Sequence, residues 1–452
     1  MALHRALKLN RQDAYIQDFL ATLYFMEENV EAALKYWNPA KRPALEVIKS
    51  EPQPRLKPAI LDQAFAVAPA SVLLLSEFRN TQAALDHLEI FPTYRFELQP
   101  RTDGKFDLLF RPVEKNGWGK KTERILSIAR GIPSLTLRVD LFNLWREAVN
   151  LESRVRFDAQ KRYFFGQLSA PLGGHPSWRA KFYLDGRKEN WDLSRSYQRD
   201  APLPGDLRLR RLAAGGLLSN RLNWNWEWKS GFELSYRDFQ NLPSVSSSAS
   251  GLFKPGVALK YLAGVERKLW SIPERRFTLQ SSADFEAGKL FRGGAARFSE
   301  LAGTLEAKWF PQAKGDDYLV TAGFRAGRAD GGIPFDELFI FGLERDNDLW
   351  LRGHVATENR KRGAGFLGQD YLLANWEIEK RIYQNSIFDL RVGPAVDTGK
   401  IYDKHRNFGS GNWLVDLGLL LKARFPNGIT IILSYGKDLQ TGRNGFYATT
   451  SR

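Results

Sequence analysis

The 452-residue sequence predicts a mostly β protein, namely a transmembrane β-barrel of about 16 strands preceded by a small α+β domain and an α-helical hairpin. Three observations indicate this fold. Beyond Ile132, long segments alternate apolar and polar residues with a period of two, as half-buried strands do. Aromatic residues make up 13% of the chain, and many of the 13 Trp residues lie in those segments. No run approaches the roughly 18 uninterrupted apolar residues of a membrane-spanning helix.

The charge balance indicates which kinds of partner this protein binds. Lys and Arg exceed Asp and Glu by 66 − 51 = 15, a surplus typical of proteins that bind nucleic acid or an anionic membrane. Because the Trp residues lie in strand-like segments and not in basic loops, the membrane is favoured and no nucleic-acid partner is expected. The absence of cysteine excludes disulfides, thiolate metal sites and cysteine nucleophiles.

Residues 1–49 are predicted to be helical. Apolar residues recur near a period of 3.6 at Ala6, Leu9, Ala14, Phe19, Leu20, Leu23 and Tyr24. A second helical run covers Val30 to Trp37, and the pair resembles one tetratricopeptide repeat; a simple helical hairpin is the alternative. No signal peptide is visible at the N-terminus, and the helical pattern already includes residue 1, so we expect a fragment or a mature form.

Residues 50–131 are predicted to form a small α+β domain after a linker that contains Pro52, Pro54 and Pro58. Helices are expected over Ser71 to Phe78 and Gln82 to Leu88, followed by two strands joined at an Asp103-Gly104 turn. The segment resembles the POTRA domain, which would imply capture of extended polypeptide along an exposed sheet edge. A generic α+β domain is the alternative.

Residues 132–452 are predicted to form the barrel. Trp178 to Asp185, Trp224 to Lys229 and Asp416 to Phe425 each alternate an apolar with a polar or charged face. This is the pattern of strands that face lipid on one side and the lumen on the other. A closed barrel with an even number of strands also leaves no unpaired edge.

The most informative segment lies between Ile333 and Asp403. It contains the tetrapeptide Leu351-Arg352-Gly353-His354, then Asn-Trp-Glu ending at Glu377, then Pro-Ala-Val-Asp ending at Asp397. Alternation along the two later segments directs Glu377 and Asp397 into the lumen. A lumenal acid pair facing a loop arginine would form charge-assisted hydrogen bonds, and Gly353 would allow a tight turn.

The order of these motifs resembles the BamA/TamA-type assembly and secretion superfamily, the bacterial surface antigen family. The resemblance implies that Arg352, at the tip of a loop folded into the barrel, meets Glu377 and Asp397. It also implies a seam between the first and last strands, at Leu135, Leu137 and Val139 on one side and Phe446 and Tyr447 on the other. His354 departs from the family's usual Phe or Tyr, and the chain does not end on an aromatic residue.

The same resemblance implies a function without covalent chemistry. The barrel would lie in the bacterial outer membrane and insert β-barrel proteins or translocate polypeptides, and residues 1–131 would meet periplasmic accessory proteins and unfolded outer-membrane or secreted polypeptides. A passive porin or a two-partner secretion transporter is the alternative. The five histidines show no metal-ligand spacing, and no catalytic set is evident, so neither enzymatic activity nor a cofactor or metal is expected.

Overall fold

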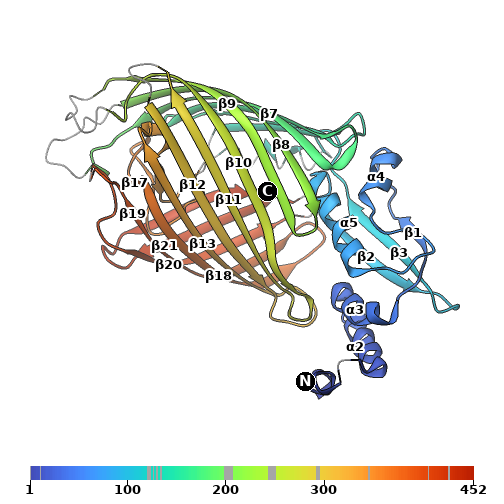
Figure 1. Cartoon of the computed structure of the whole chain (residues 1–452). Helices are drawn as coiled ribbons and strands as arrows, with labels where there is room; N and C mark the ends of the chain where they lie inside the picture. Colours follow the sequence, from blue (N-terminus) through green and yellow to red (C-terminus); the bar gives the residue numbers. More distant parts are fainter. Residues whose placement is uncertain are drawn as a thin grey trace.

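In the computed structural model, a small N-terminal region rests against one end of a large barrel (Figure 1). The structure describes residues 2–10, 12–119, 124–125, 127–128, 131–132, 135–197, 207–242, 251–291, 296–344, 347–405, 407–425 and 428–451. The chain begins with three α-helices, as expected, which are α1 (Ala2–Leu9), α2 (Ala14–Met26) and α3 (Val30–Trp37), followed by a 3₁₀ turn, η1 (Asn38–Ala40). The Asp13 and Asn29 side chains cap α2 and α3 by accepting hydrogen bonds from backbone N–H groups.

An α+β unit follows, and its elements are β1 (Leu45–Ser50), α4 (Pro58–Ala64), α5 (Leu75–His87), β2 (Thr93–Pro100) and β3 (Phe106–Val113). The sheet order is β1-β3-β2, with β1 parallel and β2 antiparallel to β3. The unit therefore starts before the expected boundary at residue 50. The expected division into two helices is wrong: the single helix α5 runs through both predicted segments without a break at Asn80. The other helix of the unit, α4, begins at Pro58, which suits a first helical position.

The barrel contains 15 long strands in the described ranges, each antiparallel to the next in the chain. They are β4 (Thr136–Leu144), β5 (Val149–Phe157), β6 (Lys161–Leu172), β7 (His175–Trp191), β8 (Leu207–Asn223), β9 (Trp226–Gln240), β10 (Gly256–Ile272), β11 (Phe277–Leu290), β12 (Ala296–Trp309), β13 (Tyr318–Gly331), β18 (Asp370–Gln384), β19 (Asp389–Tyr402), β20 (Leu414–Arg424), β21 (Thr430–Asp438) and β22 (Asn444–Ser451). The number is close to the expected 16.

The first and last strands differ from the other neighbours. The circular strand order places β22 beside β4. The two are hydrogen-bonded neighbours that close the barrel, and β4 also pairs with β5 and β22 with β21. Because 15 strands alternate in direction, β4 and β22 run the same way.

One expected strand begins two residues later than predicted. The Trp224 to Lys229 segment was predicted as continuous, but β8 ends at Asn223 and β9 begins at Trp226. The Asn223 side chain accepts a hydrogen bond from the Asn225 backbone N–H at 3.1 Å, which closes an Asx turn there. None of the helices in the described ranges is long and apolar enough to cross a membrane.

Side-chain burial follows the predicted alternation over most of the wall. Trp376 and Ile378 on β18 are exposed on the outside, whereas Glu377 between them is half-buried and Glu379 beyond them is buried. The pattern reverses at the start of β8, where Leu207 and Leu209 are buried inside and Arg208 and Arg210 are exposed outside. The expected polar lumen is therefore wrong for this end of the barrel.

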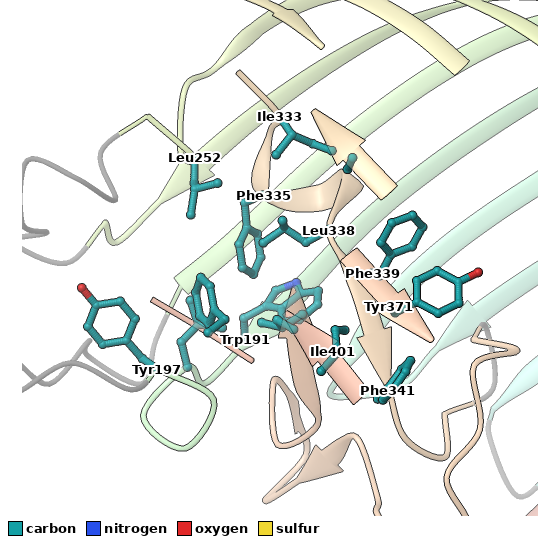
Figure 2. Close-up of a cluster of buried hydrophobic side chains, with 14 of the residues drawn as sticks. Trp191, Tyr197, Leu252, Ile333, Phe335, Leu338, Phe339, Phe341, Tyr371 and Ile401 are labelled. Atoms are coloured by element: carbon teal, nitrogen blue, oxygen red, sulfur yellow. The ribbon is translucent and has the colours of Figure 1, made fainter. Parts of the chain in front are cut away.

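A hydrophobic cluster explains the reversal (Figure 2). Inward residues of several strands, including Trp191, Leu209 and Tyr371, pack against residues 333–351 of the loop that joins β13 to β18. Phe335 meets the Trp191 ring edge-on, with centroids 4.9 Å apart. The lumen at the end far from the N-terminal region is thus a packed core. We call this end of the barrel the distal end and the other the proximal end.

The N-terminal region is anchored at the proximal end through Arg179 of β7. Its guanidinium is fully buried and donates hydrogen bonds to the backbone oxygens of His87 and Leu88, each at 3.1 Å. It also forms an ion pair with Glu89 at 3.1 Å. On the same helix end, the His87 ring contacts the Pro176 carbonyl oxygen through Nδ1 at 2.7 Å.

Candidate functional site

The candidate site is built on the long connection between β13 and β18, residues 332–369, which we call the lumen loop. Because β13 pairs directly with β18, this segment is an insertion between neighbouring strands that folds back into the barrel. It contains η4 (Phe335–Glu337), β14 (Phe339–Phe341), β15 (Thr357–Glu358), β16 (Lys361–Arg362) and β17 (Phe366–Gly368). Pairing of β14 with β17 holds its two limbs together.

Arg352 lies at the inner tip of the lumen loop, and the structure brings it together with both predicted acids. Its guanidinium donates to Oδ1 of Asp397 and to Oε1 of Glu377. Its backbone N–H donates to Oδ2 of Asp397 at 2.9 Å, so this carboxylate is held through both oxygens. Arg352 is 3% and Asp397 1% exposed, so the pair is shielded from water. Removal of either partner would leave the other as an unpaired buried charge.

Glu377 extends the network along the wall. Its second oxygen accepts a hydrogen bond from Lys422 at 2.5 Å, and Lys422 also reaches Glu379 at 2.7 Å. Arg424 donates to the other oxygen of Glu379, also at 2.7 Å. The Arg352 contact is therefore one end of a chain of alternating charges across β18 and β20.

Gly353 and His354 continue the contact onto the next two strands. The Gly353 N–H donates to Oδ2 of Asp416 on β20 at 2.6 Å. The His354 ring lies between two carboxylates, with Nδ1 3.1 Å from Asp416 and Nε2 3.5 Å from Asp438 on β21. Both carboxylates are buried, and His354 is the side chain of the loop that bridges them.

The three aspartates form a row. Asp397 is paired in register with Asp416, and Asp416 with Asp438, across β19, β20 and β21. Successive loop residues thus meet successive strands. Asp416 and Asp438 were not predicted as site residues, although their position among alternating apolar residues directs both inward.

Three glycines make room for the loop tip. Gly418, Gly436 and Gly445 are in register across β20, β21 and β22. A Cβ at Gly418 would lie 3.0 Å from Cδ of Arg352, and a Cβ at Gly436 or Gly445 would overlap the Arg352 carbonyl group. The absence of side chains there lets the loop backbone lie against the strands.

The outer limb of the lumen loop is tied to the opposite wall. Asp336 accepts a hydrogen bond from Arg237 of β9 at 2.9 Å, and Glu337 accepts one from the same guanidinium at 3.0 Å. Lys260 of β10 lies 3.3 Å from Glu337. Arg237 and Asp336 are almost completely buried, so this second anchor is as well shielded as the first.

A third tie joins the returning limb to β7. Arg362 forms ion pairs with Glu189 at 2.5 Å and with Glu344 at 2.7 Å. Its guanidinium also lies 4.3 Å from the centre of the Trp191 ring, within the range of a cation–π contact. The lumen loop therefore spans the barrel, fixed to β7, β9 and β10 on one side and to β18–β21 on the other.

The predicted seam residues lie on both faces of the wall. Leu135, Leu137 and Phe446 are exposed on the outside, whereas Val139 is half-buried. Tyr447 points toward the loop, with its ring 6.1 Å from that of Trp350. Leu351 is buried in the hydrophobic cluster and anchors the residue before Arg352.

Within the described residues, His354, Asp416 and Asp438 are the group with ligand atoms close enough to consider a metal ion, all within 4.8 Å of one another. The two carboxylates face different ring nitrogens, however. This is the arrangement of a ring that bridges two acceptors, since one ion would bind a single ring nitrogen.

No protein-family model matches the sequence, and no curated protein matches it. Among solved structures, the chain is similar to BamA from Haemophilus ducreyi lacking POTRA domains 1–3, with a TM-score of 0.52 and 12% identity over 91% of this chain and 85% of that one. It is also similar to CdiB from Escherichia coli, with a TM-score of 0.56 and 13% identity over 90% and 76% of the two chains.

The chain has the fold of these barrels. CdiB from Acinetobacter baumannii gives the same result, with a TM-score of 0.51 and 13% identity over 91% of this chain and 74% of that one. BamA and CdiB are outer-membrane β-barrel proteins, so the predicted barrel fold is confirmed. The tetratricopeptide-like and POTRA-like interpretations of the N-terminal residues stay predictions.

Proposed function

We propose that this protein is an outer-membrane factor that inserts β-barrel proteins into the bacterial outer membrane or translocates polypeptides across it. The observation that carries the proposal is the lumen loop, which is tied to both walls and places Arg352 against β18–β21, beside the last strand. A loop fixed in this way stiffens the wall up to β21, whereas the barrel closes between β4 and β22, two strands that run the same way and so pair slightly less stably than antiparallel neighbours.

The direction of the two seam strands supports a templating role. Because β4 and β22 run the same way, one further strand inserted between them, once their junction opens, would be antiparallel to both. Antiparallel addition to an exposed edge needs only backbone hydrogen bonds and tolerates many sequences. A client strand, or the chain's own residues before β4, would fit this place.

The N-terminal region would act as the periplasmic arm. Residues 44–113 form the POTRA-like unit of the proposal, in which β2 is an edge strand suited to pair with extended polypeptide. Residues 1–40 form the tetratricopeptide-like unit that would meet accessory proteins. Arg179 and His87 hold this arm at the proximal end, which would therefore face the periplasm. No step of this function requires covalent chemistry, a cofactor or a metal.

The hydrophobic cluster argues against a passive porin. A porin needs a continuous water-filled lumen, and the distal end of this barrel is filled by packed apolar side chains. A two-partner secretion transporter stays the second candidate, because the likeness to CdiB is as close as that to BamA.

Photo-crosslinking at the seam tests the proposal and separates its two forms. A benzophenone amino acid at Leu137 or Phe446, both exposed on the outside, should trap nascent barrel proteins if the protein is an insertase. The same probe at Phe285, exposed on β11, is the matched control. Adducts with a soluble secreted partner instead, at inward positions such as Tyr447, would favour secretion. Equal adducts at Phe285 and at the seam would reject a seam-based mechanism.

A further inference from the structure

The outer face of the barrel carries an unusual row of positive charges at the distal end. Arg162 of β6 is in register with Lys188 of β7, and Lys188 is in register with Arg210 of β8. Arg208 lies two residues before Arg210 in β8, closer to the distal end. Arg162, Arg208 and Arg210 are exposed, and Lys188 is half-buried. We call Arg162, Lys188 and Arg210 the basic row.

An apolar surface borders the basic row on its proximal side. The next row on the same face consists of Phe164, Gly186 and Leu212, which are in register with one another. Phe164 is 47% and Leu212 61% exposed, as expected for side chains in contact with lipid. Since strands rise about 3.3 Å per residue, the cations lie only about 7 Å beyond this apolar row.

The basic row has no counter-ion in the described part of the chain. No ion pair or side-chain hydrogen bond joins any of its three members to a carboxylate there, and Asp238, in register with Arg210, forms no ion pair with it. The inward cations of the same strands behave differently: Lys161 pairs with Glu189, Arg187 with Asp185, and Arg211 with Glu233. The contrast is therefore between the two faces and not between the strands.

Three like charges in adjacent register positions repel one another, because directly opposed side chains lie about 5 Å apart at Cβ. The arrangement becomes favourable when an external anion bridges them. Arg and Lys side chains bind phosphate through charge-assisted hydrogen bonds, and a site at the edge of an apolar band suits an anion attached to a hydrocarbon tail.

We infer that the basic row binds the phosphate groups of a lipid headgroup in the leaflet that surrounds the distal end. The inference rests on the proposed function only for the orientation, which directs this end away from the periplasm. The outer leaflet of a bacterial outer membrane contains phosphorylated glycolipid, whose phosphates lie directly above its acyl chains. A lipid held there would fix the depth of the barrel beside the hydrophobic cluster.

The test compares two double variants of the purified full chain in a zwitterionic detergent. Lys188→Gln/Arg210→Gln removes two charges of the row, and Arg267→Gln/Arg275→Gln removes two exposed charges near the proximal end. Binding of fluorescent bis-phosphorylated lipid A should weaken about tenfold or more in the first variant, as for the loss of two charge-assisted hydrogen bonds, and stay unchanged in the second.

Two further arms identify the source of the phosphate. Lipid A without phosphates should bind weakly to the unmodified protein, and inorganic phosphate should not displace the labelled lipid at matched concentration. Equal affinities of the two double variants, or displacement by inorganic phosphate alone, would overturn the inference.

Folding is verified by the shift in gel mobility on heating, and Lys188→Arg/Arg210→Lys should retain binding because the charges remain. The readout uses no client, so loss of lipid binding with intact seam crosslinking would separate this inference from the proposed function. Unchanged lipid binding by Lys188→Gln/Arg210→Gln would contradict this inference and would not affect the proposed function.

Discussion

Gly436 lies directly beneath Arg352, so that a Cβ at this position would overlap the Arg352 carbonyl group. The closeness couples the wall at β21 to the tip of the lumen loop without any side-chain contact from the strand. The loop tip can therefore dock in this position only if residue 436 has no side chain.

Gly436→Ala is therefore expected to displace the loop tip and destabilise the barrel by about 1–3 kcal/mol, the usual cost of overpacking. The measurement is the temperature at which the folded form loses its distinct gel mobility. Gly323→Ala on β13 is the matched control, since its Cβ would meet nothing within 4 Å. Equal melting of the two variants would show that the loop tip does not press on β21.

His354→Leu should also lower stability, because it leaves the buried carboxylates of Asp416 and Asp438 without their shared partner. Asp416 keeps the Gly353 N–H and Asp438 keeps the N–H groups of Gln440 and Thr441, so the cost is that of a lost hydrogen bond to a charged group, about 1.5–3 kcal/mol. Unfolding in guanidinium chloride from detergent micelles measures the change. His175→Leu, at an exposed turn, should have almost no effect. A higher free energy of unfolding in His354→Leu would mean that His354 destabilises the fold.

The anchor on the opposite wall controls whether the lumen is filled. Arg237→Leu removes the closer of the two arginines that Asp336 and Glu337 share, Arg211 being the other, and should loosen the outer limb of the lumen loop. Single-channel recordings in planar bilayers should then show larger and more frequent openings than for the unmodified protein. Arg267→Leu, on the outer face, should behave like the unmodified protein. A large steady conductance before any substitution would instead indicate a porin.

Docking of the N-terminal region should weaken in acid. Burial lowers the pKa of His87, against the opposing effect of the Pro176 carbonyl and of Glu227. The freed ring therefore binds a proton more readily than the docked ring. Docking is fully stable above the ordinary histidine pKa of about 6.5 and loses stability as the pH falls through and below that value.

Hydrogen exchange of the α5 amides reports this change. The protection factor of these amides, which corrects for the slower intrinsic exchange in acid, should fall on moving from neutral to acidic buffer in the unmodified protein, and His87→Gln should flatten the dependence. An unchanged profile in His87→Gln would assign the pH dependence to another group.

Alternation along single strands predicted the inward direction of Glu377 and Asp397, because side-chain direction in a strand follows from residue parity. The bounds of α3, Val30 to Trp37, were predicted from the helical pattern of the sequence. The contact of Arg352 with these two acids was predicted from the order of the motifs, through the family resemblance.

Contacts across the barrel could not be predicted in this way. Nothing in the sequence near Asp336 indicates Arg237 as its partner, because the two are joined only when the loop crosses the lumen. The hydrophobic cluster was missed for a related reason. Leu207 and Leu209 alternate with arginines just as lipid-facing residues would, and only the folded loop shows which side is buried.

Charge reversal at Arg352 tests the central claim most directly. Arg352→Glu would place a fourth acid beside Glu377, Asp397 and Asp416, and Arg352→Lys keeps the charge but loses the two-armed contact. Client assembly, with heat-modified gel mobility as the control for folding, should be abolished by Arg352→Glu, reduced by Arg352→Lys and partly restored in Arg352→Glu/Asp397→Arg. Client assembly that is unchanged in Arg352→Glu would contradict the account and favour a plain channel.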